Sequence, residues 1–180
     1  MPAKTGRCTV SIFVILVRLL SKGPKNGPDA SMHARLTDGV ITMYIQPYLF
    51  FNGHCEEAVQ YYQKHLGAKV NVLMRYKEMP SDAARPGVNY DGEKIMYGNL
   101  TIGDSVIMVS DDCVNTNVPF QGFSLSISVN DEKEAERVFA ALTDGGKVHA
   151  PLNKTFFSPC FGMAVDRFGM SWMVIVPGQQ

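Results

Sequence analysis

The sequence predicts an α+β fold built from two copies of one unit, each a strand, a helix and about three further strands. Two observations predict it: the chain repeats itself, and apolar residues recur at spacings typical of strands and of helices. Glu57-Ala58 returns as Glu134-Ala135, 77 positions later. The predicted repeat units span about 44–112 and 120–177, within one domain formed by 44–180.

The first unit is expected to begin with a strand at 48–51 and to continue with a helix near 55–66. Apolar residues of this helix recur every three to four positions, which is the spacing of one helix face. Gly67 follows and is placed to end the helix.

The second unit is expected to follow the same order. In the strand at 123–129, apolar residues alternate with three serines, a pattern typical of a half-buried strand. A helix near 131–144 follows, and Gly145 is placed to end it.

Each unit is expected to close with a hairpin. Residues 102–108 match residues 168–174 at an offset of 66, with Gly103 aligned to Gly169. Ser105 and Ser171 align in the same register, so the shared Gly and Ser define which residues of the two units correspond.

Four segments resemble the PhnB-like branch of the glyoxalase/bleomycin-resistance/extradiol dioxygenase superfamily, also called vicinal oxygen chelate proteins. They are 47–70, 73–80, 122–131 and 154–176, and none lies in the first 43 residues. The resemblance implies that the two βαβββ repeats form a cupped, incomplete barrel around a pocket. It also implies a homodimer.

In metalloenzymes of this superfamily, the first and last strands of each unit supply one metal ligand each, commonly His, Gln or Glu. Counted back from the two helices, the first-strand positions here are Pro47 and Ser124. Counted four past the hairpin glycines, the last-strand positions are Ile107 and Met173. None carries the imidazole, carboxylate or thiolate that zinc, nickel or iron requires, so we expect no metal and no other cofactor. The nearby histidines, His54, His65 and His149, are interpreted as solvated surface residues.

The expected ligand-binding residues are polar and aromatic. Ser124 and Ser126 face the cup if the alternating apolar residues face the helix, although they also fit the wet face of a strand. Tyr97 and Asn99 alternate in the same way in another strand, and the resemblance more often gives His at position 97. A cation beside aromatic rings suits a planar or anionic ligand, but core packing explains the rings equally well. The candidates are Tyr97, Asn99, Ser124, Ser126, Lys154, Phe156 and Trp172.

Other reactive side chains are given structural roles. Asp166-Arg167 is expected to build the turn before Phe168-Gly169. Cys55 is expected to be a buried thiol. Members of the PhnB-like branch are often described as methyltransferases, but the chain has no Gly-rich turn between a strand and a helix. We therefore do not expect methyltransferase activity.

The composition limits the possible partners. The 17 basic and 17 acidic residues cancel, and no Lys/Arg-rich run is present, so nucleic acid is not expected as a partner. The four cysteines are spaced as neither a metal clip nor a disulfide framework, which indicates reduced thiols in a cytoplasmic protein.

Residues 1–43 differ from the rest and are interpreted as a leader or linker that is not part of the fold. They hold six basic and two acidic side chains, and an apolar run at 8–17 resembles a signal peptide. Arg18 interrupts that run, which is too short to span a membrane. A cleaved or membrane-touching leader is the alternative.

These observations favour a glyoxalase-fold protein that binds an unidentified small molecule in its cup without a metal. The alternative is a metal-independent enzyme on the same fold, of lyase, isomerase or oxygenase-like type. In either case we expect a homodimer and no membrane span.

Overall fold

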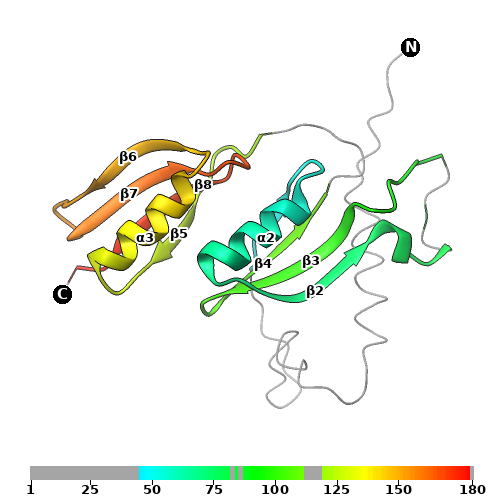
Figure 1. The fold of residues 1–180 in the computed structure, drawn as a ribbon, viewed down its shortest axis with the longest axis horizontal. Coiled ribbons are helices and arrows are strands. Elements are labelled where there is room, and N and C mark those ends of the chain that lie inside the picture. The colour runs from blue at the N-terminus through cyan, green and yellow to red at the C-terminus, as the bar shows by residue number, and fades with distance from the viewer. Residues whose placement is uncertain (1–44, 82–83, 85–86, 112–118, 179–180) are drawn as a thin grey trace, which may run out of the picture.

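The computed structural model describes residues 45–81, 84, 87–111 and 119–178, so the predicted leader at 1–43 lies outside the described residues. The elements follow the predicted order, two βαβββ units in succession (Figure 1). The first unit consists of β1 (Tyr48–Phe50), α2 (Cys55–Leu66), β2 (Lys69–Arg75), the 3-10 turn η2 (Tyr76–Glu78), β3 (Ile95–Ile102) and β4 (Ser105–Ser110). The second consists of β5 (Leu125–Ser128), α3 (Glu132–Thr143), β6 (Lys147–Asn153), β7 (Cys160–Val165) and β8 (Ser171–Val176).

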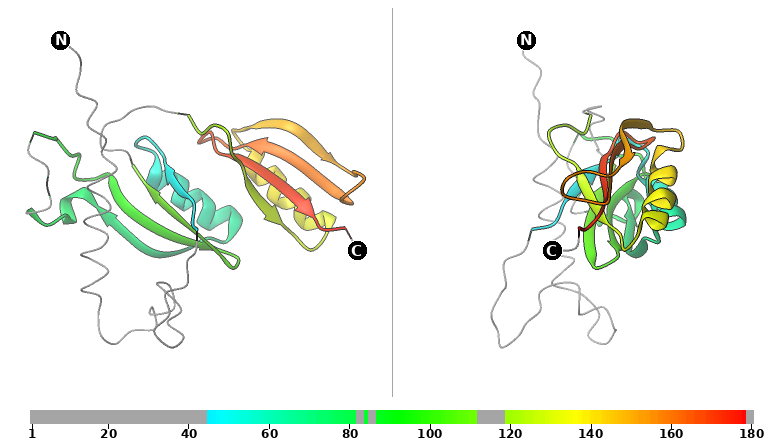
Figure 2. Two further views of the ribbon diagram at one scale, coloured as in Figure 1. Left: turned by 180° about the vertical axis from the view of Figure 1, so that it is seen from behind. Right: turned by 90° about the vertical axis from the view of Figure 1, so that its left-hand side faces the viewer.

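Each unit forms one four-stranded sheet, in the order β1-β4-β3-β2 in the first and β5-β8-β7-β6 in the second. The first strand of each unit pairs parallel with the last, and the other pairs are antiparallel. The two units lie side by side, and both helices cover the same side of the molecule (Figure 2). This arrangement confirms the predicted α+β fold.

One hydrophobic core runs beneath both helices. The buried side of α2 packs over strand residues such as Leu49, Leu100 and Val109, and that of α3 packs over Trp172 and Val174. Because successive strand residues point to opposite faces, the residues between these apolar ones lie on the face turned away from the helices.

The two units correspond in a register one residue away from the predicted one. The β3–β4 turn contains two residues between paired Ile102 and Ser105, whereas the β7–β8 turn contains five between Val165 and Ser171. Equivalent bonds, from Phe51 N to Ser110 O and from Val129 N to Ile175 O, align position 110 with 175. Aligning the turn glycines is therefore wrong by one residue for the last strands.

A buried aspartate outside the helix organises the start of α2. His54 makes no side-chain cap at this helix. Instead, Asp111 Oδ1 accepts hydrogen bonds from Gly53 N at 2.8 Å and Cys55 N at 2.9 Å, while its Oδ2 accepts one from Ile95 N at 2.9 Å. The carboxylate therefore fixes the ends of β1 and β3 against the helix.

A second buried aspartate joins the two units. Asp166 Oδ2 accepts from Tyr62 Oη at 2.6 Å and from Trp172 Nε1 at 2.8 Å, and its Oδ1 accepts from Phe168 N and Met170 N, both at 2.9 Å. Asp166 thus builds the β7–β8 turn, as predicted from the sequence, and also holds α2 of the first unit.

Further contacts reinforce the same junction. Tyr61 Oη donates to the Ala141 carbonyl, and Arg137 Nη1 donates to the His65 carbonyl at 2.9 Å. The Arg167 guanidinium lies 4.7 Å from the centre of the Tyr61 ring. The junction is thus made of helix–helix and helix–turn contacts on the covered side of the sheets.

We predict that Asp166→Ala lowers the free energy of unfolding by about 3 kcal/mol, because it leaves the buried Tyr62 and Trp172 donors without their acceptor. For a chain of this size, this corresponds to a fall of roughly 6–12 °C in melting temperature. Thermal and urea unfolding followed by circular dichroism measure the change.

Asp144→Ala is the matched control, since Asp144 pairs with Arg167 at an exposed position of the same junction. Its unfolding free energy is expected to change by less than about 1 kcal/mol. Equal losses in the two variants would contradict a special role for the buried carboxylate.

Candidate functional site

The candidate site lies on the face of the first sheet turned away from α2. The strand register places Tyr48 and Asn99 on either side of Met108, and the same alternation adds Tyr97, Thr101 and Ser110. We define the polar face as the five residues Tyr48, Tyr97, Asn99, Thr101 and Ser110. The predicted site residues Tyr97 and Asn99 belong to it, and both are buried.

Two hydroxyl groups of the polar face are buried without a well-formed hydrogen bond to any of the described residues: Tyr48 Oη and Ser110 Oγ. Burial raises the pKa of Tyr48 to about 12, and the nearby Ser110 hydroxyl opposes this shift only in part. The phenol is therefore protonated at physiological pH. Sequence reasoning missed both residues, although the alternation around Leu49 and Val109 could have identified them.

Hydrogen bonds from one amide, that of Asn71, fix the side chains at the other end of the polar face. Asn71 Nδ2 donates to Asn99 Oδ1 at 3.0 Å and to Thr101 Oγ1 at 2.7 Å. Asn71 sits at an irregularity in the β2–β3 pairing, between Val70 and Val72. The irregularity lets its side chain reach across the sheet and fix the orientation of the Asn99 amide.

The second sheet places serines on its corresponding face. Ser126 pairs with Met173 in the β5–β8 register, while Leu125 and Ile127 pack against the core, as the alternation predicts. The Ser124 and Ser171 hydroxyls lie 2.7 Å apart. Ser124 and Ser126 thus belong to one region of the second sheet.

The other predicted site residues lie elsewhere. Trp172 faces α3, is 2% exposed and donates to Asp166, so it belongs to the core beneath the helices. Lys154 and Phe156 lie in the connection between β6 and β7, and Phe156 is fully exposed. The Phe156 ring packs edge-on against Phe157, with centroids 5.0 Å apart. The structure does not bring Trp172 together with the polar face.

The corrected register changes the positions at which superfamily metalloenzymes would hold a metal. Pro47 and Ile107 are replaced by their strand neighbours, because Ile107 packs into the core. Ser124 is replaced by Ser126, because Ser126 is the residue that pairs with Met173. The positions on the face away from the helices are Tyr48, Met108, Ser126 and Met173. In the described part of the chain, no group of three His, Cys, Asp or Glu residues is placed to hold a metal ion.

The histidines and Cys55 lie outside these positions. His54 is exposed and lies 3.4 Å from Glu57. His65 packs against the Tyr61 ring, and His149 is exposed. Cys55 is fully buried in the core, where burial, with Asp111 nearby, raises its thiol pKa well above the ordinary value. This environment disfavours the thiolate and fits the structural role predicted from the sequence.

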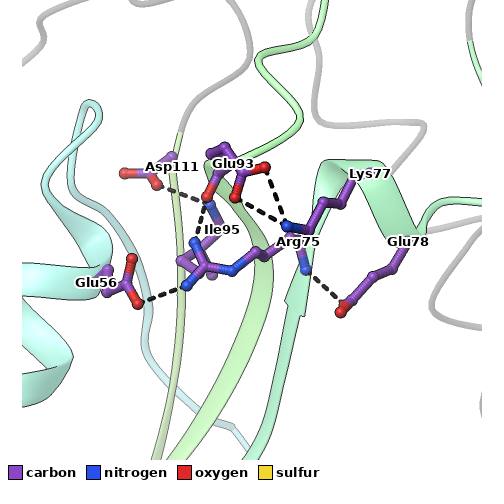
Figure 3. A network of polar contacts seen from close by, with 7 residues as sticks. All are labelled: Glu56, Arg75, Lys77, Glu78, Glu93, Ile95 and Asp111. Atoms are coloured by element: carbon purple, nitrogen blue, oxygen red, sulfur yellow. Dashed lines mark hydrogen bonds and ion pairs between the residues drawn. The ribbon is translucent and has the colours of Figure 1, made fainter.

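A polar cleft of about 410 Å³ lies on the helix side, between the start of α2 and the ends of β2 and β3. Its charged groups bind one another (Figure 3). Arg75 contacts Glu56 at 2.5 Å and the Glu93 carbonyl, and Lys77 contacts the Glu93 carboxylate at 2.9 Å. The Arg75 guanidinium holds the pKa of Glu56 below its usual value. These contacts tie the strands to the helix and indicate a structural role.

The helices of the described residues are too short to cross a membrane. The two α-helices have 12 residues each, and none of the described helices is long and apolar enough for a span.

Comparison with known proteins extends over the whole described domain. A family model described as 3-demethylubiquinone-9 3-methyltransferase matches residues 43–175. Protein YjdN of Escherichia coli is 33% identical over 144 residues, which cover 77% of this chain and 98% of YjdN.

Two solved structures share both sequence and fold with this chain. Protein PA1353 from Pseudomonas aeruginosa is 37% identical with a TM-score of 0.68, and the match covers 77% of this chain and all of that one. A PhnB protein from Bacillus cereus, also described as a 3-demethylubiquinone-9 3-methyltransferase, is 27% identical with a TM-score of 0.63 and coverages of 74% and 99%.

The fold extends to more distant proteins. A glyoxylase/bleomycin resistance protein/dioxygenase domain from Frankia is 12% identical with a TM-score of 0.51, over 77% of this chain and 98% of that one, which shows a common fold alone. The repeated βαβββ units, the close relatives and the family match agree. The chain therefore belongs to the family described as 3-demethylubiquinone-9 3-methyltransferase, is similar to a PhnB protein of that description, and shares its fold with a glyoxylase/bleomycin resistance protein/dioxygenase domain.

Proposed function

We propose that this protein is a cytoplasmic binding protein for a small molecule, which it holds on the polar face of the first sheet without a metal. The observation that carries the proposal is the pair of buried hydroxyls of Tyr48 and Ser110. A buried hydroxyl without a partner costs roughly 1–3 kcal/mol, and a bound molecule that hydrogen-bonds to it recovers that energy.

The position of these hydroxyls supports the proposal. Tyr48 and its neighbour Met108 occupy the first and last strands, where superfamily metalloenzymes are expected to hold their metal. A phenol and a thioether are poor ligands for a divalent cation such as zinc. The same place in the fold therefore suits direct hydrogen bonding to a ligand better than metal chelation.

We further propose that the second sheet supplies the other wall of the pocket and takes part in a symmetric homodimer. Its face away from α3 carries half-buried apolar side chains, including Phe161, Met163, Met173 and Ile175. Phe156 and Phe157 extend this apolar surface. A surface of this kind favours association with another chain.

Within this pocket, the proposed roles of the predicted residues differ. Tyr97 and Asn99 contact the ligand from the first sheet, and Ser124 and Ser126 from the second. Lys154 and Phe156 close the pocket from their loop. Trp172 does not contact the ligand but supports the second sheet from the helix side, through its bond to Asp166.

A metal-independent enzyme is the second candidate, and the buried hydroxyls of Tyr48 and Ser110 favour it. Hydrogen bonds from these O–H groups can stabilise negative charge that develops on a substrate oxygen. The raised pKa of Tyr48, about 12, makes its phenol a weak general acid, so this role is hydrogen bonding and not proton transfer. Asp166 is a weaker candidate for acid–base work, because four donors already bind its carboxylate.

The activity in the family's description is not part of the proposal. A methyltransferase of the common doubly wound type has a parallel sheet with helices on both faces. The two mixed sheets and one-sided helices here lack that arrangement within the described residues, as the sequence lacks its Gly-rich turn.

We predict that native mass spectrometry of the purified full chain detects a co-purifying small molecule, and that Tyr48→Phe combined with Ser110→Ala lowers its occupancy at least tenfold. The lost hydrogen bonds are the reason. Ser105→Ala, at an exposed position of the same strand, is the control and is expected to keep the wild-type occupancy. A compound retained in full by the double variant would contradict the site.

We predict that the dialysed protein holds less than about 0.1 transition-metal ion per chain, and that EDTA leaves its melting temperature unchanged. The reason is the donor set at Tyr48, Met108, Ser126 and Met173. Elemental analysis measures the metal. About one ion per chain, lost on mutating Tyr48 or Met108, would overturn metal-independent binding.

We predict that sedimentation equilibrium at micromolar concentration gives about twice the chain mass of 19.9 kDa. Met173→Glu is expected to shift the mass toward the monomer, because it places a charge on the apolar face. Lys133→Glu on α3 is the control and should leave the dimer intact. A monomer mass for the wild-type chain at every concentration would refute the homodimer.

A further inference from the structure

The chemistry of the polar face points to one class of ligand. We propose that the ligand is an uncharged molecule in which a hydrogen-bond-accepting oxygen, such as a carbonyl, adjoins an aromatic ring or another apolar group. This inference rests on the proposed function, because it concerns what the same site binds.

The strands that form the polar face supply no counter-charge for an ion. The strands β1, β2, β3 and β4 contain no Asp, Glu or His, and their two charged residues are Lys69 and Arg75. Lys69 is exposed at the outer end of its strand, and Arg75 is bound to Glu56 on the helix side. Lys154 follows β6 of the second unit and is exposed. An ion buried on the polar face would therefore lose its hydration without gaining an opposite charge from the first sheet.

Asp111 does not change this conclusion, although it directly follows β4. Its two carboxylate oxygens accept three backbone hydrogen bonds, from Gly53, Cys55 and Ile95. The negative charge is thus directed toward the start of α2 and the start of β3. It is committed to the fold and offers no site for a cationic ligand.

The polar face presents hydrogen-bond donors that need an acceptor. The pKa of Tyr48 keeps its phenol protonated, and the Ser110 hydroxyl also carries a proton. If one hydroxyl donates to the other, the second O–H of the pair still needs an acceptor. Both oxygens are buried, so an acceptor oxygen on the ligand is the group that satisfies the pair.

Asn99 adds a further donor. Its Oδ1 already accepts from Asn71, so the amide group that it can present to a ligand is Nδ2. Asn99 is buried and its amide orientation is fixed by the Asn71 bond. The polar face therefore presents donors in preset directions, which favours a ligand rich in acceptors.

Apolar side chains lie next to these donors and suit an apolar part of the ligand. The Tyr48 ring stacks on Phe50, with centroids 4.9 Å apart and planes inclined by 29°. Met108 lies beside Tyr48 in the sheet and adds a polarizable thioether. Rings and a thioether next to the donors suit a molecule whose accepting oxygen is attached to a ring.

The test uses three probes with the same ring and different charges: acetophenone, benzoate and benzylammonium. Chemical-shift titration of the full-length, ¹⁵N-labelled protein gives the dissociation constant of each. Acetophenone is expected to bind at least tenfold more tightly than either ion. Tyr48→Phe and Ser110→Ala are each expected to weaken acetophenone at least threefold, while Ser105→Ala leaves it unchanged.

Folding of the variants is checked by their melting temperatures. Tyr48→Phe removes a buried hydroxyl that lacks a good partner, so its melting temperature is expected to equal or exceed that of the wild type. A loss of acetophenone binding at unchanged stability is then a loss of the site.

The outcomes separate the ligand class from the proposed binding function. Benzoate or benzylammonium binding as tightly as acetophenone would overturn the uncharged ligand but leave a pocket. A dissociation constant for acetophenone that is unchanged in both Tyr48→Phe and Ser110→Ala would overturn the donor assignment. Failure of all three probes, while a compound still co-purifies, would overturn this inference alone. Failure of the probes with no co-purifying compound would overturn the proposed function as well.

Discussion

The relative placement of the two units depends on the buried carboxylate of Asp166. A carboxylate that is only 3% exposed is costly unless donors surround it. Its four hydrogen bonds come from both units, with Tyr62 on α2, the Phe168 and Met170 amides in the β7–β8 turn, and Trp172 on β8. Burial and the adjacent carboxylate also raise the pKa of Tyr62 well above its ordinary value, so this phenol remains a donor. The Tyr62–Asp166 contact therefore holds one unit against the other.

The second buried carboxylate, Asp111, links the fold to the candidate site. It fixes the start of α2, and the neighbouring bond from Phe51 N to the Ser110 carbonyl fixes β1 against β4. That bond holds the backbones of Tyr48 and Ser110 in register. Charged groups thus do structural work at the edges of the sheet, and neutral groups remain on the polar face. The same division explains why charged groups of the polar cleft beside α2 bind one another, while the hydroxyls of Tyr48 and Ser110 lack a well-formed hydrogen bond to the described residues.

The sequence predicts the fold well because its signals are local. The repeat, the period-two strands and the bounds of α2 were all recoverable, and α3 differs by one residue at each end. The site was less predictable, because it depends on the register between strands. The two hairpin turns share a Gly and a Ser but differ in length. Aligning their glycines therefore matches Met173 with Ile107, although its structural equivalent is Met108. The position of Trp172 depends on a bond to Asp166, which no local pattern indicates.

The two units share a topology but have different faces. Position 48 is a tyrosine and its equivalent, position 126, is a serine, while position 110 is a serine and position 175 an isoleucine. The first face is thus rich in buried donors, and the second offers half-exposed apolar area with small hydroxyls. Duplication alone would give two equal faces. In the proposed pocket, the first face orients the ligand through hydrogen bonds while the second contributes apolar contacts. The hydrogen bonds then take the role of orienting the ligand that metal chelation has in the metalloenzymes of the superfamily.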